Sequence, residues 1–369
     1  MKKDLSSLDI HYLLKELTVL IDQKIDKIYH PEKKELLLQF HIIGQGKRIL
    51  RIIAGKFMFL TDLKEEHSEP SGFCMFLRKH LDNARLRSLK QLESERIVEF
   101  VFEKKEGKEI LIIELFGNGN IICTDDKYQI LSAVEYHKWK DREINPKLKY
   151  EYPKKPANIF DLKLKDLKDA INCSDKESIV KTLAANLGFG GVYSEEICLL
   201  ANIDKNTPPG KLTDKDINKL ADTASSLLNN NISAKIIFEN NEPIDTVPFD
   251  LKLYAQYNQK EFKTFSEALD VYVGSKKEIK KTAKQNQIEK LQRIIDTQKE
   301  QIRELEIGET KEREKAELIY NNYKLIDEIL KEIQKASEKY SWQEIKEKLK
   351  GHKIIKEINL KDKKITIEI

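Results

Sequence analysis

A long helical repeat near the end of the chain limits what this sequence can fold into more than any other feature. Apolar residues recur there in steps of three and four: Ile288, Leu291, Ile295, Ile302 and Leu305, then Ala316, Ile319, Tyr323, Ile326, Leu330 and Ile333. A seam that keeps this register for so long is typical of a coiled coil. Gly308, Glu309 and Glu312 weaken it in the middle.

The seam predicts a partner, because apolar surface left in water costs roughly 25 cal/mol per Å². We therefore expect the helix to pair with a second copy of the chain or to fold back at Gly308. A short helix around Trp342, Ile345 and Leu349 follows it. Residues 354–360 and 365–369 then predict a β-hairpin around Lys361-Asp362-Lys363. We expect residues 273–369 to form a coiled-coil arm with a terminal hairpin.

Residues 1–155 predict an α+β domain. Ser7 or Asp9 can cap a first helix, whose apolar residues continue to Leu20, and residues 72–83 predict a second helix. Short β-branched or aromatic runs separated by turn residues predict strands at 25–29, 35–43, 48–53, 57–61, 96–102, 109–116 and 120–124. Such closely spaced strands indicate a mainly antiparallel sheet.

Residues 156–272 predict a second, mostly helical domain, which begins after a stretch broken by Pro146, Pro153 and Pro156. Helical patterns at 179–187 and 192–201 flank Gly188-Phe189-Gly190-Gly191 and indicate a helix-hairpin-helix motif. Gly188, Gly190 and Gly191 could let backbone N–H groups face a phosphate, or they could only form a tight turn. Glu195 and Glu196 would oppose a phosphate placed nearby. A helix at 213–229 and a strand at 234–238 follow.

Charge indicates a nucleic-acid partner only locally. The 369-residue chain has a formal net charge of +4, which is too small to argue for such a partner by itself. Residues 78–96 carry a local net charge of +3, with Arg78, Lys79, Arg85, Arg87 and Arg96 among the cations. This cluster could bind phosphates through charge and guanidinium hydrogen bonds, or it could belong to a solvated amphipathic helix.

The search for catalytic motifs finds none. The sequence has no P-loop, no GxSxG and no HExxH, and its four cysteines form no CxxC pair. We expect no enzymatic activity, no metal and no cofactor, and we expect the cysteines to be buried thiols. The opening Met1-Lys2-Lys3-Asp4 is not followed by the apolar core of a signal peptide, and no apolar run reaches membrane-spanning length. We expect a cytoplasmic protein.

A set of short motifs occurs in order along nearly the whole chain. The segments are Ser7-Leu8-Asp9, Lys15-Glu16-Leu17, residues 25–29 and 77–81, Gln91 with residues 95–98, residues 114–121 and 183–196, Ala316-Glu317-Leu318-Ile319 and Tyr340-Ser341-Trp342. This ordered set resembles the NFACT family of ribosome quality-control factors. The resemblance implies a first domain similar to the N-terminal domain of formamidopyrimidine-DNA glycosylases, then a helix-hairpin-helix domain and a coiled coil. It also implies that the chain stops before the family's second long helix and its C-terminal RNA-binding domain.

The resemblance implies that the chain binds the large ribosomal subunit with its peptidyl-tRNA and ribosomal RNA. In the family this binding supports rescue of stalled translation and template-free tailing of the stalled peptide. An aspartate that matches Asp9 and an Asp-Arg pair that matches Glu95 and Arg96 are needed for tailing and act on tRNA. Glu95 stands where the family has aspartate, so its longer side chain could misplace a hydrogen bond.

Three other functions fit parts of the sequence. The chain could be an adhesin of the fibronectin-binding type, as bacterial members of the family were once named, or a coiled-coil scaffold that binds only protein. A DNA-repair glycosylase is disfavoured, because those enzymes use an N-terminal proline followed by glutamate and this chain begins Met1-Lys2-Lys3. Asp9 could be only a helix cap, and Glu95 and Arg96 only a surface ion pair.

Overall fold

The computed structural model describes residues 2–42, 44, 46–62, 69–105, 107–139, 142–153, 158–360 and 364–368, without the side chains of residues 276–287 and 289. The chain divides into two compact units, an N-terminal unit (Met1–Ile279) and a C-terminal unit (Lys280–Ile369). The three domains expected from the sequence stay a prediction. The first of their boundaries, between residues 155 and 156, lies outside the described residues.

Two antiparallel sheets form the first half of the N-terminal unit, as the sequence predicted. One has the order β1-β2-β3-β4, with β1 (Ile25–Glu32), β2 (Glu35–Ile42), β3 (Gly46–Ile53) and β4 (Phe57–Thr61). The other has the order β5-β6-β7-β8-β9, with β5 (Arg85–Gln91), β6 (Ile97–Lys104), β7 (Gly107–Glu114), β8 (Asn120–Asp125) and β9 (Ile130–Ala133). Buried side chains of both sheets share one core, which includes Leu38, Leu50, Phe100 and Leu111.

Strands β5 and β9 were not predicted from the sequence. In the region of β5 the sequence indicated a basic cluster that could bind phosphates or belong to a solvated amphipathic helix. The segment pairs instead along β6, from Arg85 opposite Glu103 to Gln91 opposite Val98. Leu86 is buried and the neighbouring arginines point outward, a half-buried alternation that suits a strand.

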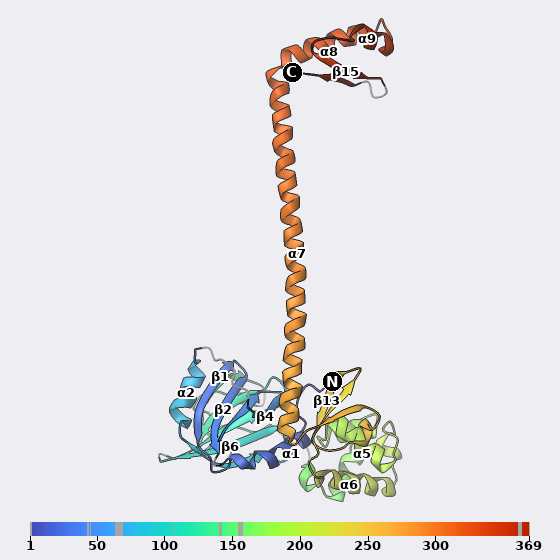
Figure 1. Ribbon diagram of the computed structural model, residues 1–369. Coiled ribbons are helices and arrows are strands. Elements are labelled where there is room, and N and C mark those ends of the chain that lie inside the picture. Colours follow the sequence, from blue (N-terminus) through green and yellow to red (C-terminus); the bar gives the residue numbers. More distant parts are fainter. Residues whose placement is uncertain are drawn as a thin grey trace. The chain divides into compact units, whose positions relative to one another are not determined.

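Helix α1 (Ser7–Leu17) connects the two halves of the N-terminal unit. Its Ile10 and Leu13 pack in the core of the sheets, whereas its Leu8 and Tyr12 pack in a second core formed by the later helices. Figure 1 shows α1 between the strands and the helices α5 and α6. The cap expected at Ser7 or Asp9 is wrong: Ser6 is the N-cap, and Asp9 is its partner in a capping box.

The second core is mostly helical, as the sequence predicted. It is built by α3 (Leu164–Asn172), α4 (Ile179–Ala185), α5 (Gly191–Ala201) and α6 (Asp214–Leu228). A three-stranded antiparallel sheet with the order β13-β12-β14 completes it, with β12 (Lys235–Glu239), β13 (Glu242–Val247) and β14 (Asn258–Glu261). In the first half, helix α2 (Gly72–Leu81) packs against β1, and β10 (His137–Lys138) and β11 (Glu143–Ile144) form a small antiparallel sheet.

Helix α7 (Phe265–Asn321) begins in the N-terminal unit, where Phe265, Leu269 and Tyr272 are buried. It continues unbroken through Gly308 to Asn321, so the fold-back considered for Gly308 does not occur. The seam residues Leu291, Ile302 and Leu305 are more than half exposed in the single chain. They form an apolar stripe without a partner within the described part of the chain.

The end of the predicted seam belongs to a small separate core. Helix α8 (Tyr323–Ser337) places Ile333 against Ile345 of α9 (Trp342–Lys348). The predicted hairpin is present as β15 (Ile355–Asn359) and β16 (Lys364–Ile367), and Ile355 and Ile358 pack on the same core. The expected turn residues Lys361, Asp362 and Lys363 lie outside the described residues. The predicted seam is interrupted between α7 and α8, and of its later residues Ile333 is buried in this core whereas Tyr323 and Leu330 are exposed.

The cysteines were expected to be buried thiols, and no segment was expected to span a membrane. Cys74, Cys123 and Cys198 are buried thiols as expected, but Cys173 is exposed, because it follows the last turn of α3 at the surface. Among the helices of the described residues, none is both long and apolar enough to cross a membrane.

Candidate functional site

A cleft of about 470 Å³ lies where α1, the loop between β5 and β6, and the start of α5 meet. It brings together residues that are far apart in the sequence. Among those that line it are the predicted site residues Asp9, Glu95, Arg96, Gly188, Gly190 and Gly191. Lys2, Tyr193, Asp245 and Tyr254 line it as well.

Asp9 lies at the inner side of this cleft and is only 1% exposed. Its carboxylate accepts hydrogen bonds of 2.8 Å from the backbone N–H and from the hydroxyl of Ser6, and one of 2.7 Å from the hydroxyl of Tyr193. Lys2 Nζ lies 2.9 Å from Asp9 Oδ2. All of these contacts are internal, so Asp9 connects α1, α5 and the N-terminal segment.

Lys2 is the centre of a buried charge network. Besides Asp9, its ammonium contacts the carboxylate of Asp245 at 3.5 Å and the backbone oxygen of Thr246 at 2.6 Å. Burial lowers the pKa of Lys2, but the charges of Asp9 and Asp245 outweigh it and raise this pKa above its ordinary value. Lys2 is therefore charged in the folded chain and neutralises two carboxylates that would otherwise be buried without compensation.

Two tyrosines complete the network. Tyr193 of α5 donates to Asp9, and Tyr254 donates to Asp245 at 2.6 Å. Burial, with the nearby carboxylates, raises the pKa of both phenols, so both hydroxyls stay protonated and able to donate. The network fixes α5 and β13 against the start of the chain.

Arg96 is the predicted cation at the cleft. Its side chain is 31% exposed and forms an ion pair with Asp4 at 3.0 Å. Its Nη1 also donates to the backbone oxygen of Leu5 at 3.3 Å. Glu95 precedes it in the loop and lines the same cleft. An exposed ion pair of this kind contributes at most about 1 kcal/mol, so a phosphate could replace Asp4 as the partner of the guanidinium.

The glycines lie at the N-terminus of α5. Gly188 and Gly190 have φ of 81° and 78°, which non-glycine residues adopt at a cost. Gly190 is the N-cap of α5 and offers no side-chain cap, so the N–H groups of the first turn remain available. Gly190 also lies against Ser6, the N-cap of α1. Two helix N-termini, each with a partial positive charge, therefore meet at the cleft.

The acids that were expected to oppose a phosphate here are engaged elsewhere. Glu196 is 1% exposed and accepts 2.8 Å hydrogen bonds from the backbone N–H groups of Lys252 and Leu253. Glu195 forms an ion pair with Lys205 at 2.8 Å. Neither carboxylate lines the cleft.

The structure places the other predicted cations away from this cleft. Arg78 donates through Nε and Nη2 to the backbone oxygen of Ile28 at 2.9 and 2.8 Å. Arg85 donates to the backbone oxygen of Asp22, and Arg87 pairs with the carboxylates of Asp22 and Glu103. These arginines connect β5 and α2 to neighbouring strands and loops.

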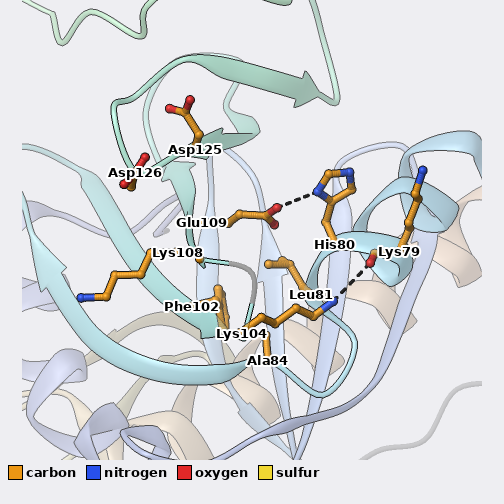
Figure 2. Close-up of a pocket in the computed structure, with 11 residues that line it drawn as sticks. Lys79, His80, Leu81, Ala84, Phe102, Lys104, Lys108, Glu109, Asp125 and Asp126 are labelled. Carbon is orange, nitrogen blue, oxygen red and sulfur yellow. Dashed lines mark hydrogen bonds and ion pairs between the residues drawn. The ribbon is translucent and has the colours of Figure 1, made fainter.

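Lys79 borders a second cavity, of about 510 Å³, at the end of α2. In Figure 2, Lys104 contacts the backbone oxygen of Lys79, and His80 points toward Glu109. The His80 Nδ1 to Glu109 Oε1 distance is 2.7 Å. Asp125 and Asp126 line the same cavity, so its cations and acids are mixed.

Sequence reasoning missed Lys2, Tyr193, Asp245 and Tyr254 as site residues. Lys2 and Asp245 are separated by almost the whole N-terminal unit, and no local pattern connects them. The only sequence signal is weak. It comes from Asp245, which lies in β13 close to the apolar Ile244 and Val247, where a carboxylate needs a partner if it is buried.

A family profile and two relatives match most of this chain. The family profile described as NFACT N-terminal and middle domains matches residues 6–368. The archaeal Rqc2 homolog aRqcH of Methanocaldococcus jannaschii is 33% identical over 374 residues, which are 96% of this chain and 55% of that protein. The human ribosome quality control complex subunit NEMF is 27% identical over 94% of this chain and 35% of that protein. The chain thus spans about half, or less, of the length of these relatives.

Two solved structures share the fold. The fibrinogen binding protein from Staphylococcus aureus has a TM-score of 0.61 and 18% identity, over 72% of this chain and 97% of that one. The N-terminal part of the fibronectin/fibrinogen-binding protein from Streptococcus suis has a TM-score of 0.60 and 21% identity, over 74% of this chain and all of that one (100%). At these identities the likeness concerns the fold and not the ligand.

Proposed function

The chain belongs to the NFACT family, and from that premise we propose that it is a ribosome quality-control factor that binds the large ribosomal subunit while this still carries peptidyl-tRNA. The names of the archaeal and human relatives support the quality-control role. The proposal assigns binding to the chain and no catalysis. It includes a cytoplasmic location and contact with ribosomal RNA.

The cleft at Arg96 is the proposed contact for the tRNA backbone. The observation that carries this part of the proposal is the convergence of Arg96 with the uncapped N-terminus of α5 on one accessible surface. A guanidinium and helix N–H groups are the donors that bind phosphate oxygens without reading bases. In this proposal α4, Gly188–Gly191 and α5 form a helix-hairpin-helix motif. The two sheets of the first half correspond to the N-terminal domain of formamidopyrimidine-DNA glycosylases. Template-free tailing of the stalled peptide additionally requires that Glu95 can replace the aspartate that the family has at this position.

Arg96→Ala is expected to weaken binding to isolated large subunits carrying peptidyl-tRNA by roughly 10- to 100-fold, because one charge-assisted hydrogen bond to phosphate contributes about 1.5–3 kcal/mol. Co-sedimentation across a salt series, with and without peptidyl-tRNA, measures this. Wild-type binding should rise when peptidyl-tRNA is present and fall with salt.

Arg48→Ala is the matched control. Arg48 also forms an ion pair with an aspartate, at 2.5 Å to Asp62, and its side chain is similarly exposed at 36%, but it does not line the cleft. The two variants change net charge equally. Equal loss of binding in both would mean that bulk charge and not the cleft binds tRNA, and no binding by the wild-type chain would refute the proposed function for this stretch of sequence.

We also propose that the exposed stripe of α7 pairs with a second copy of the chain. Leu291, Ile302 and Leu305 lie on this stripe. Light scattering across a concentration series should show the mass rising from that of one 43.1 kDa chain toward twice that value. Replacing Leu291 and Ile302 with glutamine should abolish the rise. A mass that stays at one chain at every concentration would exclude the pairing.

A further inference from the structure

A second cleft, of about 570 Å³, lies beside the turn that joins β7 and β8 and has a different chemistry from the Arg96 cleft. Aromatic rings, amides and one arginine line it together. The residues that carry the argument are Phe116, Asn118, His137, Trp139, Arg142 and Tyr152. Apolar flat side chains beside amide and guanidinium groups form the type of surface on which unstacked nucleobases bind.

Trp139 is half exposed, although tryptophan is among the most costly side chains to leave in water. It lies at the end of β10, where its backbone N–H donates to the oxygen of Arg142 at 2.8 Å and closes the hairpin with β11. The centroid of the His137 ring lies 5.0 Å from the centroid of the Trp139 ring. The hairpin therefore holds an indole at the edge of the cleft with about half of its surface available to a ligand.

The guanidinium of Arg142 packs against the indole of Trp139. Its guanidinium carbon lies 5.4 Å from the centre of the Trp139 ring and 5.1 Å from that of Tyr150. Its charge is compensated by the buried carboxylate of Glu114, which also accepts a 2.8 Å hydrogen bond from Tyr150. Arg142 Nε is buried and has no hydrogen-bond partner among the described residues. Arg142 lines the cleft and adds its positive charge beside the indole.

The charges beside the cleft suit a polyanion. Lys34 Nζ donates to the backbone oxygen of Asn118 at 2.6 Å, and Lys33 is 71% exposed next to it. Glu135 pairs with both lysines and with His137. The hydrogen bond from Lys33, helped by those from His137 and Lys34, lowers the pKa of Glu135 to about 2. The three cations Lys33, Lys34 and Arg142 thus exceed the two acids Glu135 and Glu114 by one charge.

We propose that this cleft binds an unpaired base of single-stranded RNA, with the base stacked on Trp139 and the adjoining phosphate near Lys33 and Lys34. The inference rests on the proposed function, because it specifies a second RNA contact of the same chain. It assigns base stacking to the Trp139 cleft and backbone contact to the Arg96 cleft.

The two tryptophans of the chain allow a direct test. Trp342→Phe leaves Trp139 as the only tryptophan, so its fluorescence reports on this cleft alone. A short oligouridylate should quench this fluorescence in a saturable manner. Inorganic phosphate and an abasic oligomer of the same length should not, because they carry charge without a base. Quenching by the abasic oligomer to the same extent would overturn the proposal.

Variants of the full-length chain test the same point by binding. Trp139→Ala should weaken binding of labelled oligouridylate about tenfold in fluorescence anisotropy, and Trp139→Phe should retain most of it, because phenylalanine keeps a ring for stacking. Tyr257→Ala is the control, since Tyr257 is an exposed aromatic residue (37%) that does not line the cleft. Unchanged affinity in Trp139→Ala, or an equal loss in Tyr257→Ala, would refute the stacking site.

The outcomes separate this inference from the proposed function. Loss of large-subunit binding in Arg96→Ala together with an unresponsive Trp139 would leave the quality-control role standing and refute the stacking site. Base-dependent quenching of Trp139 in a chain that does not bind large subunits would support an RNA site and refute the proposed role. A response of Trp139 to a peptide but not to RNA would also refute the stacking site.

Discussion

Asp9→Ala is expected to lower the free energy of unfolding by about 3–5 kcal/mol, which is the cost of removing one partner from a buried ion pair. The substitution leaves the buried ammonium of Lys2 with Asp245 at 3.5 Å as its remaining carboxylate partner, and it leaves the hydroxyl of Tyr193 without its acceptor. It also removes the capping box of α1. Urea-induced unfolding followed by circular dichroism measures the loss.

Asp216→Ala separates the buried network from ordinary helix capping. Asp216 has the same place in the capping box of α6 that Asp9 has in α1, and it accepts hydrogen bonds from the N–H and hydroxyl of Thr213 at 3.0 and 2.7 Å. Those contacts are at the surface and involve no lysine. The loss for Asp216→Ala should therefore be several-fold smaller. Similar losses for the two variants would show that Asp9 is only a helix cap.

This comparison also bears on how Asp9 could affect tRNA. With an exposed fraction of 1% and only internal contacts, its carboxylate holds Tyr193 and α5 in place beside Arg96. We infer that Asp9 acts by positioning. Asp9→Asn keeps the size of the side chain and part of its hydrogen bonding, so it should lose less stability than Asp9→Ala. If Asp9→Asn instead loses tRNA binding with full stability, direct contact by the carboxylate is the better explanation.

Sequence patterns predicted the elements whose signal is local. The apolar runs of β2 and β3, the seam of α7 and the Gly188–Gly191 turn are each encoded within one stretch of chain. Strand β5 was not predicted, because its outward arginines hide a half-buried alternation, and the ion-pair partners of Arg87, Asp22 and Glu103, come from other elements. Ile333 fits the heptad register equally well whether it faces a second helix or, as in the structure, a small separate core.

Local patterns predicted the basic cluster with Arg96 and the Gly188–Gly191 turn, whereas Asp9 and Glu95 were assigned to the site through the family resemblance. Asp9, Glu95 and Arg96 matched family positions, but nothing local indicates that Asp9 is buried and that Arg96 is accessible. That difference depends on Lys2, Tyr193 and Asp245, which come together only after the sheets, the helices and the start of the chain have packed. Burial and long-range charge pairing are properties of the fold, so single-sequence patterns do not report them.

Gly119→Ala is expected to destabilise the N-terminal unit by about 3–5 kcal/mol, which combines the cost of overpacking with that of a left-handed conformation. Gly119 has a φ of 67°, and a Cβ there would lie 1.9 Å from the backbone nitrogen of Gly55 and 2.2 Å from the carbonyl carbon of Ala54. Both atoms are backbone, so no side-chain rotation can relieve the clash. The β7–β8 turn and the β3–β4 turn would have to separate, which would open the core that the two sheets share.

Gly117→Ala isolates the steric part of this cost, because Gly117 lies in the same turn with a φ of 55° and a Cβ there would meet no atom within 4 Å. It should lose only about 1–2 kcal/mol, the cost of the left-handed conformation alone. Urea-induced unfolding of both variants, measured side by side, gives the difference. A loss for Gly119→Ala no larger than that for Gly117→Ala would mean that the two turns are not in close contact and that the sheets are held together by their apolar core alone.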